Sequence, residues 1–333
     1  MVCKKNYGGA SVKFGILGAG SWGCAFANLL VENDHDVLVW ARRKEVVDEI
    51  NNYSKNSYLP NVKLNFKATN DLNEIIKFSE FLVIAIPVQF IRDVIKNIKI
   101  WNIKGILNLS KGIEIKTLKR VSEVIEEFTN TPYSILSGPS HAEEVANKIP
   151  TAVTVSGSNA KLFQSLISND YFRVYTSEDI VGVEIAGALK NVMAIAAGIL
   201  DGLGGWDNSK AALMTRALHE MIKFGKIFGA DEKTFFGLPG VGDLMVTCNS
   251  RHSRNRMFGE LIAKGHTLNE LIKNNKMIAE GIYTVKAVVE IAKKKNIEMP
   301  IANEVYEILY NNKNPKSSMV ELMRRPLKKE WLI

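Results

Sequence analysis

Apolar residues follow two different periodicities along the chain. In the first half, short and almost continuous apolar runs alternate with segments that carry an apolar residue at every third or fourth position. The first pattern is typical of strands buried in a parallel sheet, and the second of the helices that cover it. The predicted strands are 12–18, 36–41, 81–87, 105–110, 134–138, 151–157 and 172–176, and the predicted helices are 22–32, 43–52, 71–78, 89–98 and 117–128.

This order of elements predicts a doubly wound, mostly parallel α/β sheet, the Rossmann type. After about residue 180 the strand pattern gives way to helical patterns. These lie at 178–201, 207–228, 257–264, 267–275, 282–295 and 301–311. We therefore expect a dinucleotide-binding domain over residues 1–180, followed by an all-helical substrate and catalytic domain over residues 181–333.

One helical segment, "EIAGALKNVMAIAAGIL" (184–200), is apolar or glycine at every position after Glu184 except Lys190 and Asn191. A helix that is apolar all round is a buried helix, and a lysine is rarely buried without a partner. The neighbouring residues Ala186, Gly187 and Ala194 are small. Either another helix packs closely at this point, or a ligand approaches the ammonium group.

Composition narrows the class of protein. The 333 residues are 46% hydrophobic and 23% charged, which is typical of a globular protein. No uninterrupted apolar run reaches about 18 residues, and no apolar stretch follows the basic residues near the start, so we expect a cytoplasmic protein without stable membrane insertion. The separated Cys3, Cys24 and Cys248 favour reduced thiols, and neither the cysteines nor the five histidines have metal-ligand spacing.

The formal net charge of +8 comes from scattered lysines, with one short block at 293–295. Without a long basic run, this distribution does not favour a nucleic-acid partner. It is typical of a solvated basic surface, or of a site for a phosphorylated ligand.

"VKFGILGAGSWG" places Gly18, Gly20 and Gly23 in a G-x-G-x-x-G spacing directly after a strand and at the start of a helix. In this context the glycines permit a tight turn, close approach of a pyrophosphate and close packing of helix on strand. A NAD-selective site usually has an acid at the end of the next strand, but this chain has Arg42 and Arg43. Arginines suit a 2′-phosphate, so NADP(H) is favoured or tolerated; the alternative is that both face solvent at a helix start.

Four further groups are candidates for anion binding or catalysis. Lys111 follows a predicted strand, and Ser140 either caps a helix or contacts a ligand. The segment "CNSRHSRNRMFG" concentrates basic and polar side chains suited to a phosphate, or forms an exposed basic loop: Arg251, Ser253, Arg254, Asn255 and Arg256. Asp243 and Thr247 share one face if a helix begins there, where Asp243 is either an N-cap or the partner of a lysine.

Together these segments resemble the NAD(P)-dependent glycerol-3-phosphate dehydrogenase family in its bacterial form. The resemblance covers nearly the whole chain after the first ten or so residues. It rests on "GAGSWG", "LSKGIE", "SGPSHAEEV", "EIAGALKNVMAIAAGILDGL", "GVGDLMVTC", "SRNRMFG", "MIAEGIYT" and "LMRRPLKKE". It implies reversible reduction of dihydroxyacetone phosphate to sn-glycerol 3-phosphate with NADP(H) or NAD(H), as a supply for glycerophospholipid synthesis.

The resemblance also implies roles for individual residues. The cofactor contacts beyond the three glycines would be Ser21, Trp22, Arg42, Arg43, Lys111, Ala142, Arg254, Ile278 and Glu280. The substrate site would comprise Lys111, Gly138, Ser140, Lys190, Asp243, Ser253, Arg254 and Asn255. Lys190 would be the catalytic acid/base, and we add Asn191 as a group that orients it and Thr247 as a group that holds a substrate oxygen.

Burial favours the neutral amine of Lys190, and an ammonium aimed at a carbonyl oxygen would stabilise the charge that develops during reduction. Three alternatives stay open: a reductase of carboxylated ketones, a cofactor-binding sensor without turnover, and a nucleic-acid-binding protein. We expect a homodimer, because closed dimers are the commonest assembly. The sequence leaves open the preference between NADH and NADPH, the physiological direction, feedback inhibition and the role of residues 1–11.

Overall fold

The computed structural model describes residues 11–274 and 279–330. Within these residues the chain forms two compact units. The first contains 11–111 and 119–183, and the second contains 112–118 and 184–330. The short excursion 112–118 therefore groups with the second unit, although the chain on either side of it belongs to the first.

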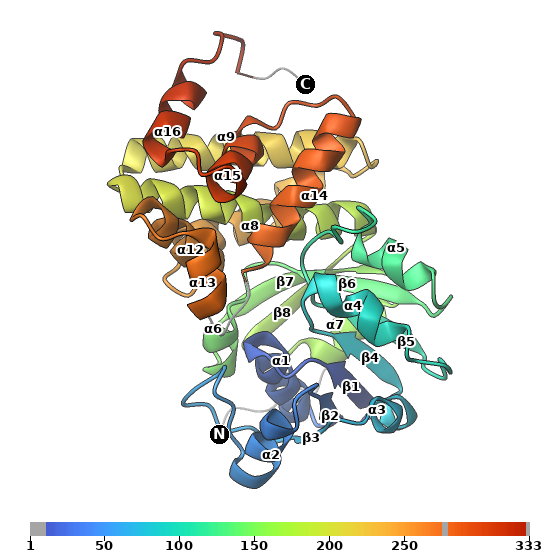
Figure 1. The fold of residues 1–333 in the computed structure, drawn as a ribbon. Coiled ribbons are helices and arrows are strands. Elements are labelled where there is room, and N and C mark those ends of the chain that lie inside the picture. Colours follow the sequence, from blue (N-terminus) through green and yellow to red (C-terminus); the bar gives the residue numbers. More distant parts are fainter. Residues whose placement is uncertain (1–10, 275–278, 331–333) are drawn as a thin grey trace. The chain divides into compact units, whose positions relative to one another are not determined.

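An eight-stranded sheet forms the frame of the first unit (Figure 1). The strand order is β3-β2-β1-β4-β5-β6-β7-β8, and every neighbouring pair is parallel except β6 and β7. The strands are β1 (Lys13–Leu17), β2 (Asp36–Trp40), β3 (Lys67–Thr69), β4 (Phe81–Ile84), β5 (Gly105–Asn108), β6 (Tyr133–Ser137), β7 (Thr151–Gly157) and β8 (Phe172–Ser177). The predicted mostly parallel α/β class is confirmed.

Helices cover both faces of this sheet because its strands are apolar on both sides. Phe14 and Ile16 of β1 belong to one core with residues of α1, α2 and α7, whereas Leu17 belongs to a second core with residues of α3, α4 and α5. The helices of this unit are α1 (Ser21–Glu32), α2 (Lys44–Tyr53), α3 (Leu72–Phe78), α4 (Val88–Ile95), α5 (Val121–Glu126), α6 (Ala142–Ala146) and α7 (Ala160–Ile167).

The described part of the second unit is helical. The chain enters it through α8 (Ile180–Leu203), whose first four residues belong to the first unit. The following helices are α9 (Asp207–Lys226), α10 (Glu232–Phe235), the π-helical turn η1 (Leu238–Gly242), α11 (Asp243–Asn249), α12 (Arg254–Ala263), α13 (Leu268–Asn274), α14 (Glu280–Lys294), α15 (Pro300–Tyr310) and α16 (Pro315–Met323). The predicted helical second half is confirmed.

Helix α8 is the core helix of the second unit. By length and composition it is apolar enough to cross a membrane, but 89% of its most apolar window is buried inside the protein. Glycines allow α12 to approach it closely: a Cβ on Gly198 would lie 1.8 Å from the Arg256 carbonyl oxygen, and one on Gly259 would lie 2.1 Å from that of Ile195. Gly198 of α8 thus serves helix packing.

Candidate functional site

The glycine turn between β1 and α1 has the geometry of a dinucleotide loop. Gly18 has φ +122°, and a Cβ there would lie 2.4 Å from the Ala85 carbonyl oxygen. A Cβ on Gly23 would lie 2.0 Å from the Gly18 carbonyl oxygen, so this glycine lets α1 pack on the end of β1. Both positions require glycine for reasons internal to the protein.

Gly20 behaves differently, since a Cβ at this position would meet no atom within 4 Å and its φ is −79°. Neither packing nor backbone conformation therefore requires glycine at the N-cap of α1. The first N–H groups of a helix lack intrahelical partners and favour an anion. Open space over Gly20 at such a helix start fits a pyrophosphate, with Ser21 and Trp22 as the first two residues of α1.

The two arginines after β2 are exposed and rest on aromatic rings. The Arg42 guanidinium lies 5.9 Å from the centroid of Phe90, and that of Arg43 lies 5.6 Å from the centroid of Tyr58. Arg43 also donates a hydrogen bond to the Tyr58 hydroxyl. Both cations are thus placed just beyond the carboxyl end of β2, where a doubly wound fold receives the adenosine ribose.

A second group of predicted residues is brought together at the ends of β5 and β6. The Lys111 ammonium and the Ser140 hydroxyl both donate to the Gly138 carbonyl oxygen, each at 3.2 Å. Gly138 has φ +143°, and a Cβ there would lie 2.9 Å from the Cα of Val153. His141 is the N-cap of α6, so capping does not account for Ser140. Ala142, the first residue of α6, is buried.

The central feature of the second unit is the buried pair of Lys190 and Asp243. The Lys190 Nζ lies 3.0 Å from the Asp243 Oδ1 and donates to the Thr247 hydroxyl at 2.9 Å. That hydroxyl donates to the same Asp243 oxygen at 3.2 Å. The side chains of Lys190 and Asp243 are only 10% and 2% exposed. The expected lysine partner of Asp243 is therefore Lys190.

The chain places Asp243 and Thr247 on one face because they are four residues apart in α11. Immediately before α11, the turn η1 packs tightly: a Cβ on Gly240 would lie 2.0 Å from the Phe235 carbonyl oxygen. The neighbouring Cys248 is buried, and burial raises the pKa of its thiol to about 12. This thiol therefore stays protonated near neutral pH and leaves Asp243 as the carboxylate partner of Lys190.

The basic loop forms the start of α12. The Ser253 hydroxyl accepts a hydrogen bond from the Arg256 backbone N–H at 3.2 Å and so caps the helix. Arg254 and Asn255 are its first two residues, half-buried and buried respectively. A capped helix start with an arginine at its first position is suited to an anion.

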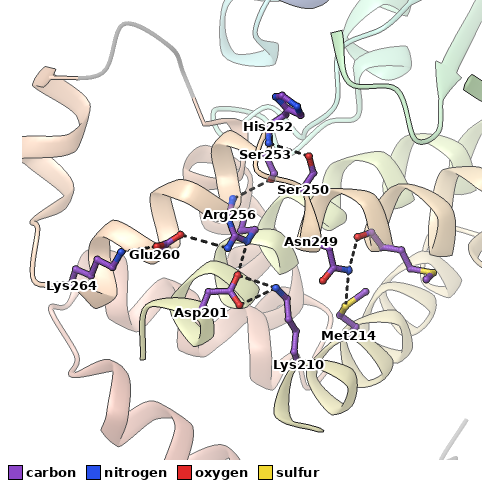
Figure 2. Close-up of polar contacts among 11 residues, drawn as sticks. Asp201, Lys210, Met214, Asn249, Ser250, His252, Ser253, Arg256, Glu260 and Lys264 are labelled. Atoms are coloured by element: carbon purple, nitrogen blue, oxygen red, sulfur yellow. Dashed lines mark hydrogen bonds and ion pairs between the residues drawn. The ribbon is translucent and has the colours of Figure 1, made fainter. Parts of the chain in front are cut away.

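Arg256 has a different role from Arg254. Figure 2 shows its guanidinium on the Asp201 carboxylate, at 2.5 Å, with the Lys210 ammonium 2.9 Å from the same carboxylate. This cluster ties α12 and α9 to the end of α8, and it was not anticipated from the sequence. The signal for this cluster in the sequence was Asp201, which is the first acidic residue after a long apolar run. Arg251 is exposed.

The remaining predicted cofactor contact that the structure describes is at the start of α14. Glu280 is the first residue of this helix and is half-buried. Ile278 lies outside the described residues. A Cβ on the adjacent Gly281 would lie 2.5 Å from the Asn191 carbonyl oxygen, so α14 begins against α8.

The glycine turn and the doubly wound sheet define the class: a dinucleotide-binding protein with a helical second unit. The family models described as the N-terminus and C-terminus of NAD-dependent glycerol-3-phosphate dehydrogenase match residues 13–163 and 179–320. The chain therefore belongs to the NAD-dependent glycerol-3-phosphate dehydrogenase family, and it is an NAD(P)-dependent enzyme.

Individual relatives agree with the family models. A glycerol-3-phosphate dehydrogenase [NAD(P)+] of Thermotoga sp. (strain RQ2) is 60% identical over 320 residues, which cover 96% of this chain and 99% of that protein. One from Staphylococcus epidermidis is 47% identical over 330 residues, with the same two coverages. The crystal structure of glycerol-3-phosphate dehydrogenase from Coxiella burnetii has a TM-score of 0.91 at 35% identity, covering 95% of this chain and 99% of that one.

Proposed function

We propose that Lys190 is the acid/base in the reversible reduction of dihydroxyacetone phosphate to sn-glycerol 3-phosphate by this enzyme. The observation that carries the proposal is the buried ammonium of Lys190, held by Asp243 and Thr247 at 3.0 and 2.9 Å. The nicotinamide, when bound, supplies the hydride. Negative charge then grows on the carbonyl oxygen, and an ammonium aimed at that oxygen stabilises the charge and donates the proton.

Asp243 keeps Lys190 in its charged form at a buried position, where desolvation alone would favour the neutral amine. Thr247 accepts from the lysine and donates to the aspartate, which fixes the direction of the ammonium group. Once Lys190 has given up a proton, Asp243 and Thr247 leave it hydrogen-bonded and ready to take up another in the reverse reaction.

Phosphate recognition is assigned to the start of α12, with Ser253 and Arg254 as the principal residues. Charge-assisted hydrogen bonds from an arginine are strong and directional, and a capped helix start adds a favourable dipole. Binding energy at the phosphate positions the carbonyl for reaction. In the first unit, Lys111, Gly138 and Ser140 form a second polar group that we assign to substrate, and we assign Lys111 to the cofactor as well.

Cofactor recognition is assigned to the turn at Gly18, Gly20 and Gly23, together with Ser21, Trp22, Ala142 and Glu280. The two exposed arginines after β2 support acceptance of a 2′-phosphate and hence of NADP(H) as well as NAD(H). We also propose a cytoplasmic homodimer that supplies sn-glycerol 3-phosphate to glycerophospholipid synthesis. Sedimentation velocity tests the dimer.

The decisive experiment follows the absorbance of NADPH or NADH after dihydroxyacetone phosphate is added to the wild type and to Lys190→Ala. We expect rapid oxidation by the wild type and a loss of about 10²- to 10⁴-fold in kcat/KM in the variant, the range for a positioned proton donor. Cofactor affinity should be unchanged.

The matched control is Lys313→Ala, which removes a lysine that bridges Glu304 and Glu321 in the same unit. It should retain wild-type turnover. Wild-type protein that binds cofactor but leaves dihydroxyacetone phosphate unreduced would contradict the substrate, whereas full activity in Lys190→Ala would contradict only the role of Lys190.

A further inference from the structure

A chain of buried hydrogen bonds joins three helices of the second unit beside the proposed catalytic lysine. The Asn255 Nδ2 of α12 donates to the Asn191 Oδ1 of α8 at 2.9 Å. The Gly281 backbone N–H of α14 donates to the Asn255 Oδ1, also at 2.9 Å. The Asn191 Nδ2 lies 3.5 Å from the Gly187 carbonyl oxygen of its own helix. Both side chains are buried, at 5% exposure for Asn191 and 8% for Asn255.

Each member of this bridge is adjacent in sequence to a residue with a proposed role in binding or chemistry. Asn191 follows Lys190, Asn255 follows Arg254, and Gly281 follows Glu280. Adjacent residues of a helix are separated by a rise of about 1.5 Å along one rigid backbone. A shift of any bridge member therefore moves the neighbouring functional residue as well.

Close packing at the same point makes the bridge stiff. A Cβ on Gly281 would lie 2.5 Å from the Asn191 carbonyl oxygen and 2.8 Å from the Ile195 Cδ1. Gly281 is not among the glycines with positive φ, so it is the contact with α8 that requires a glycine. Because the bridge is buried, removal of one amide takes away a hydrogen bond that water cannot readily replace.

We propose that Asn191 and Asn255 are positioning residues for this enzyme: their side chains hold α8, α12 and α14 in register, so that the Lys190 ammonium keeps its place beside Asp243 and Thr247. The inference rests on the proposed function of Lys190. It assigns the amide of Asn255 to the protein interior and leaves its backbone N–H, at the start of α12, for the substrate phosphate.

The test compares two ketones that differ only in the phosphate. Asn191→Ala, Asn255→Ala and the double variant are assayed with dihydroxyacetone phosphate and with dihydroxyacetone at saturating NADPH. A positioning role predicts that each single variant lowers kcat/KM by a similar factor for both ketones, at least about tenfold, since the misplaced group is the acid/base. It also predicts that kcat falls, and that the double variant loses little more than the worse single one.

Asn249→Ala is the matched control, because the Asn249 amide donates to Met245 and Met214 at an exposed site of the same unit (Figure 2). It should retain wild-type kinetics. Thermal melts define a temperature at which every variant is folded. If Asn255→Ala impairs turnover of dihydroxyacetone phosphate but spares dihydroxyacetone, its amide contacts the phosphate and the proposal is wrong. The proposal is also wrong if the fold-losses in kcat/KM of the two single variants multiply in the double variant.

Gly281→Ala gives an independent readout that needs only dihydroxyacetone phosphate. It keeps both asparagines but pushes the start of α14 away from α8. The proposal predicts a fall in kcat of the same order as in Asn255→Ala, and unchanged kcat contradicts it. Wild-type turnover of dihydroxyacetone phosphate, measured in the same series, tests the proposed function separately from the bridge.

Discussion

The three glycines of the turn between β1 and α1 have different physical roles. Gly18 and Gly23 are required by backbone atoms of the protein itself, which lie 2.4 and 2.0 Å from where a Cβ would be. Gly20 has open space around that position and ordinary backbone angles. The sequence motif shows all three alike, and only the folded structure distinguishes the glycines that serve the fold from the one that leaves room for a ligand.

This distinction predicts opposite behaviour of two alanine variants. Gly20→Ala should leave the stability of the cofactor-free protein within about 1 kcal/mol of the wild type, because the new methyl group meets nothing. Its affinity for NADPH should fall by about tenfold or more, since the methyl occupies the approach of the pyrophosphate. Gly23→Ala should lower the melting temperature. Calorimetric titration measures the affinity for NADPH, and thermal melts measure the stability of the two variants. Unchanged affinity in Gly20→Ala would show that the pyrophosphate does not bind over Gly20.

At the scale of whole helices, α9 and α15 are joined by one buried carboxyl group. Glu220 of α9 accepts hydrogen bonds from the N–H groups of Ile301 and Ala302, at 2.7 and 3.3 Å, and so caps α15. Glu220 is buried, and this burial raises the pKa of its carboxyl group from 4.5 to about 7 in spite of the two hydrogen bonds. The Glu220 carboxyl group that caps α15 is therefore protonated at mildly acidic pH.

The raised pKa predicts that Glu220 makes the folded state less stable as pH rises. An acid whose pKa is higher in the folded than in the unfolded state contributes its full stabilisation below the unfolded-state pKa, here 4.5. This contribution is lost as pH rises through the folded-state pKa of about 7. The free energy of unfolding of the wild type, relative to Glu220→Gln, should fall between pH 4.5 and 8. The fall is on the order of 3 kcal/mol, at about 1.4 kcal/mol per pH unit.

Urea denaturation of both proteins across this pH range measures the difference in their free energies of unfolding. The contributions of the other titrating groups are common to both proteins and cancel in this difference. Gln has the same shape and can accept from Ile301 without titrating. A difference that is constant with pH, or that rises, would show that Glu220 is ionised throughout.

At the scale of the whole molecule, the excess of positive charge is consistent with an enzyme for anions. The sequence carries a net charge of +8, and a phosphorylated ketone is a dianion near neutral pH. Long-range attraction between such partners raises the rate of encounter, and salt screens it over about 8–10 Å at ordinary ionic strengths.

We therefore expect kcat/KM for dihydroxyacetone phosphate to fall several-fold between 0.05 and 0.5 M NaCl at saturating cofactor, on the order expected for screened steering. Dihydroxyacetone has no charge and serves as the control, so its kcat/KM should be insensitive to salt. Equal salt effects on both ketones would point to a change in the enzyme rather than in substrate capture.

Much of the fold was predictable because its elements carry long, strongly periodic patterns. The strand β3 was missed because it has only three residues at the edge of the sheet. The helices α7, α10 and α16 were also missed, as was the π-helical turn η1 before α11. The antiparallel pairing of β6 and β7 leaves no mark in apolar periodicity, since both directions present the same alternation of side chains.

The candidate site divides in the same way. The glycine spacing, the buried lysine and the i,i+4 placement of Asp243 and Thr247 were visible in the sequence, because each is a local pattern. The partnership of Lys190 with Asp243 was one of two alternatives until α8 and α11 were placed. The ion pair of Arg256 with Asp201 and the bridge through Asn255 were invisible, because their partners lie 55 and 64 residues away.

The sequence by itself determined the class of sheet, the helical second half, the position of the dinucleotide turn and the family. These follow from periodicity and contiguous motifs, which are encoded over a few turns or strands. Tertiary structure decided which polar groups are hydrogen-bonded to each other, which arginine stabilises a helix junction and which glycine leaves room for a ligand. Those properties depend on burial and on distances of about 3 Å between segments far apart in the chain, and only the packed fold sets such distances.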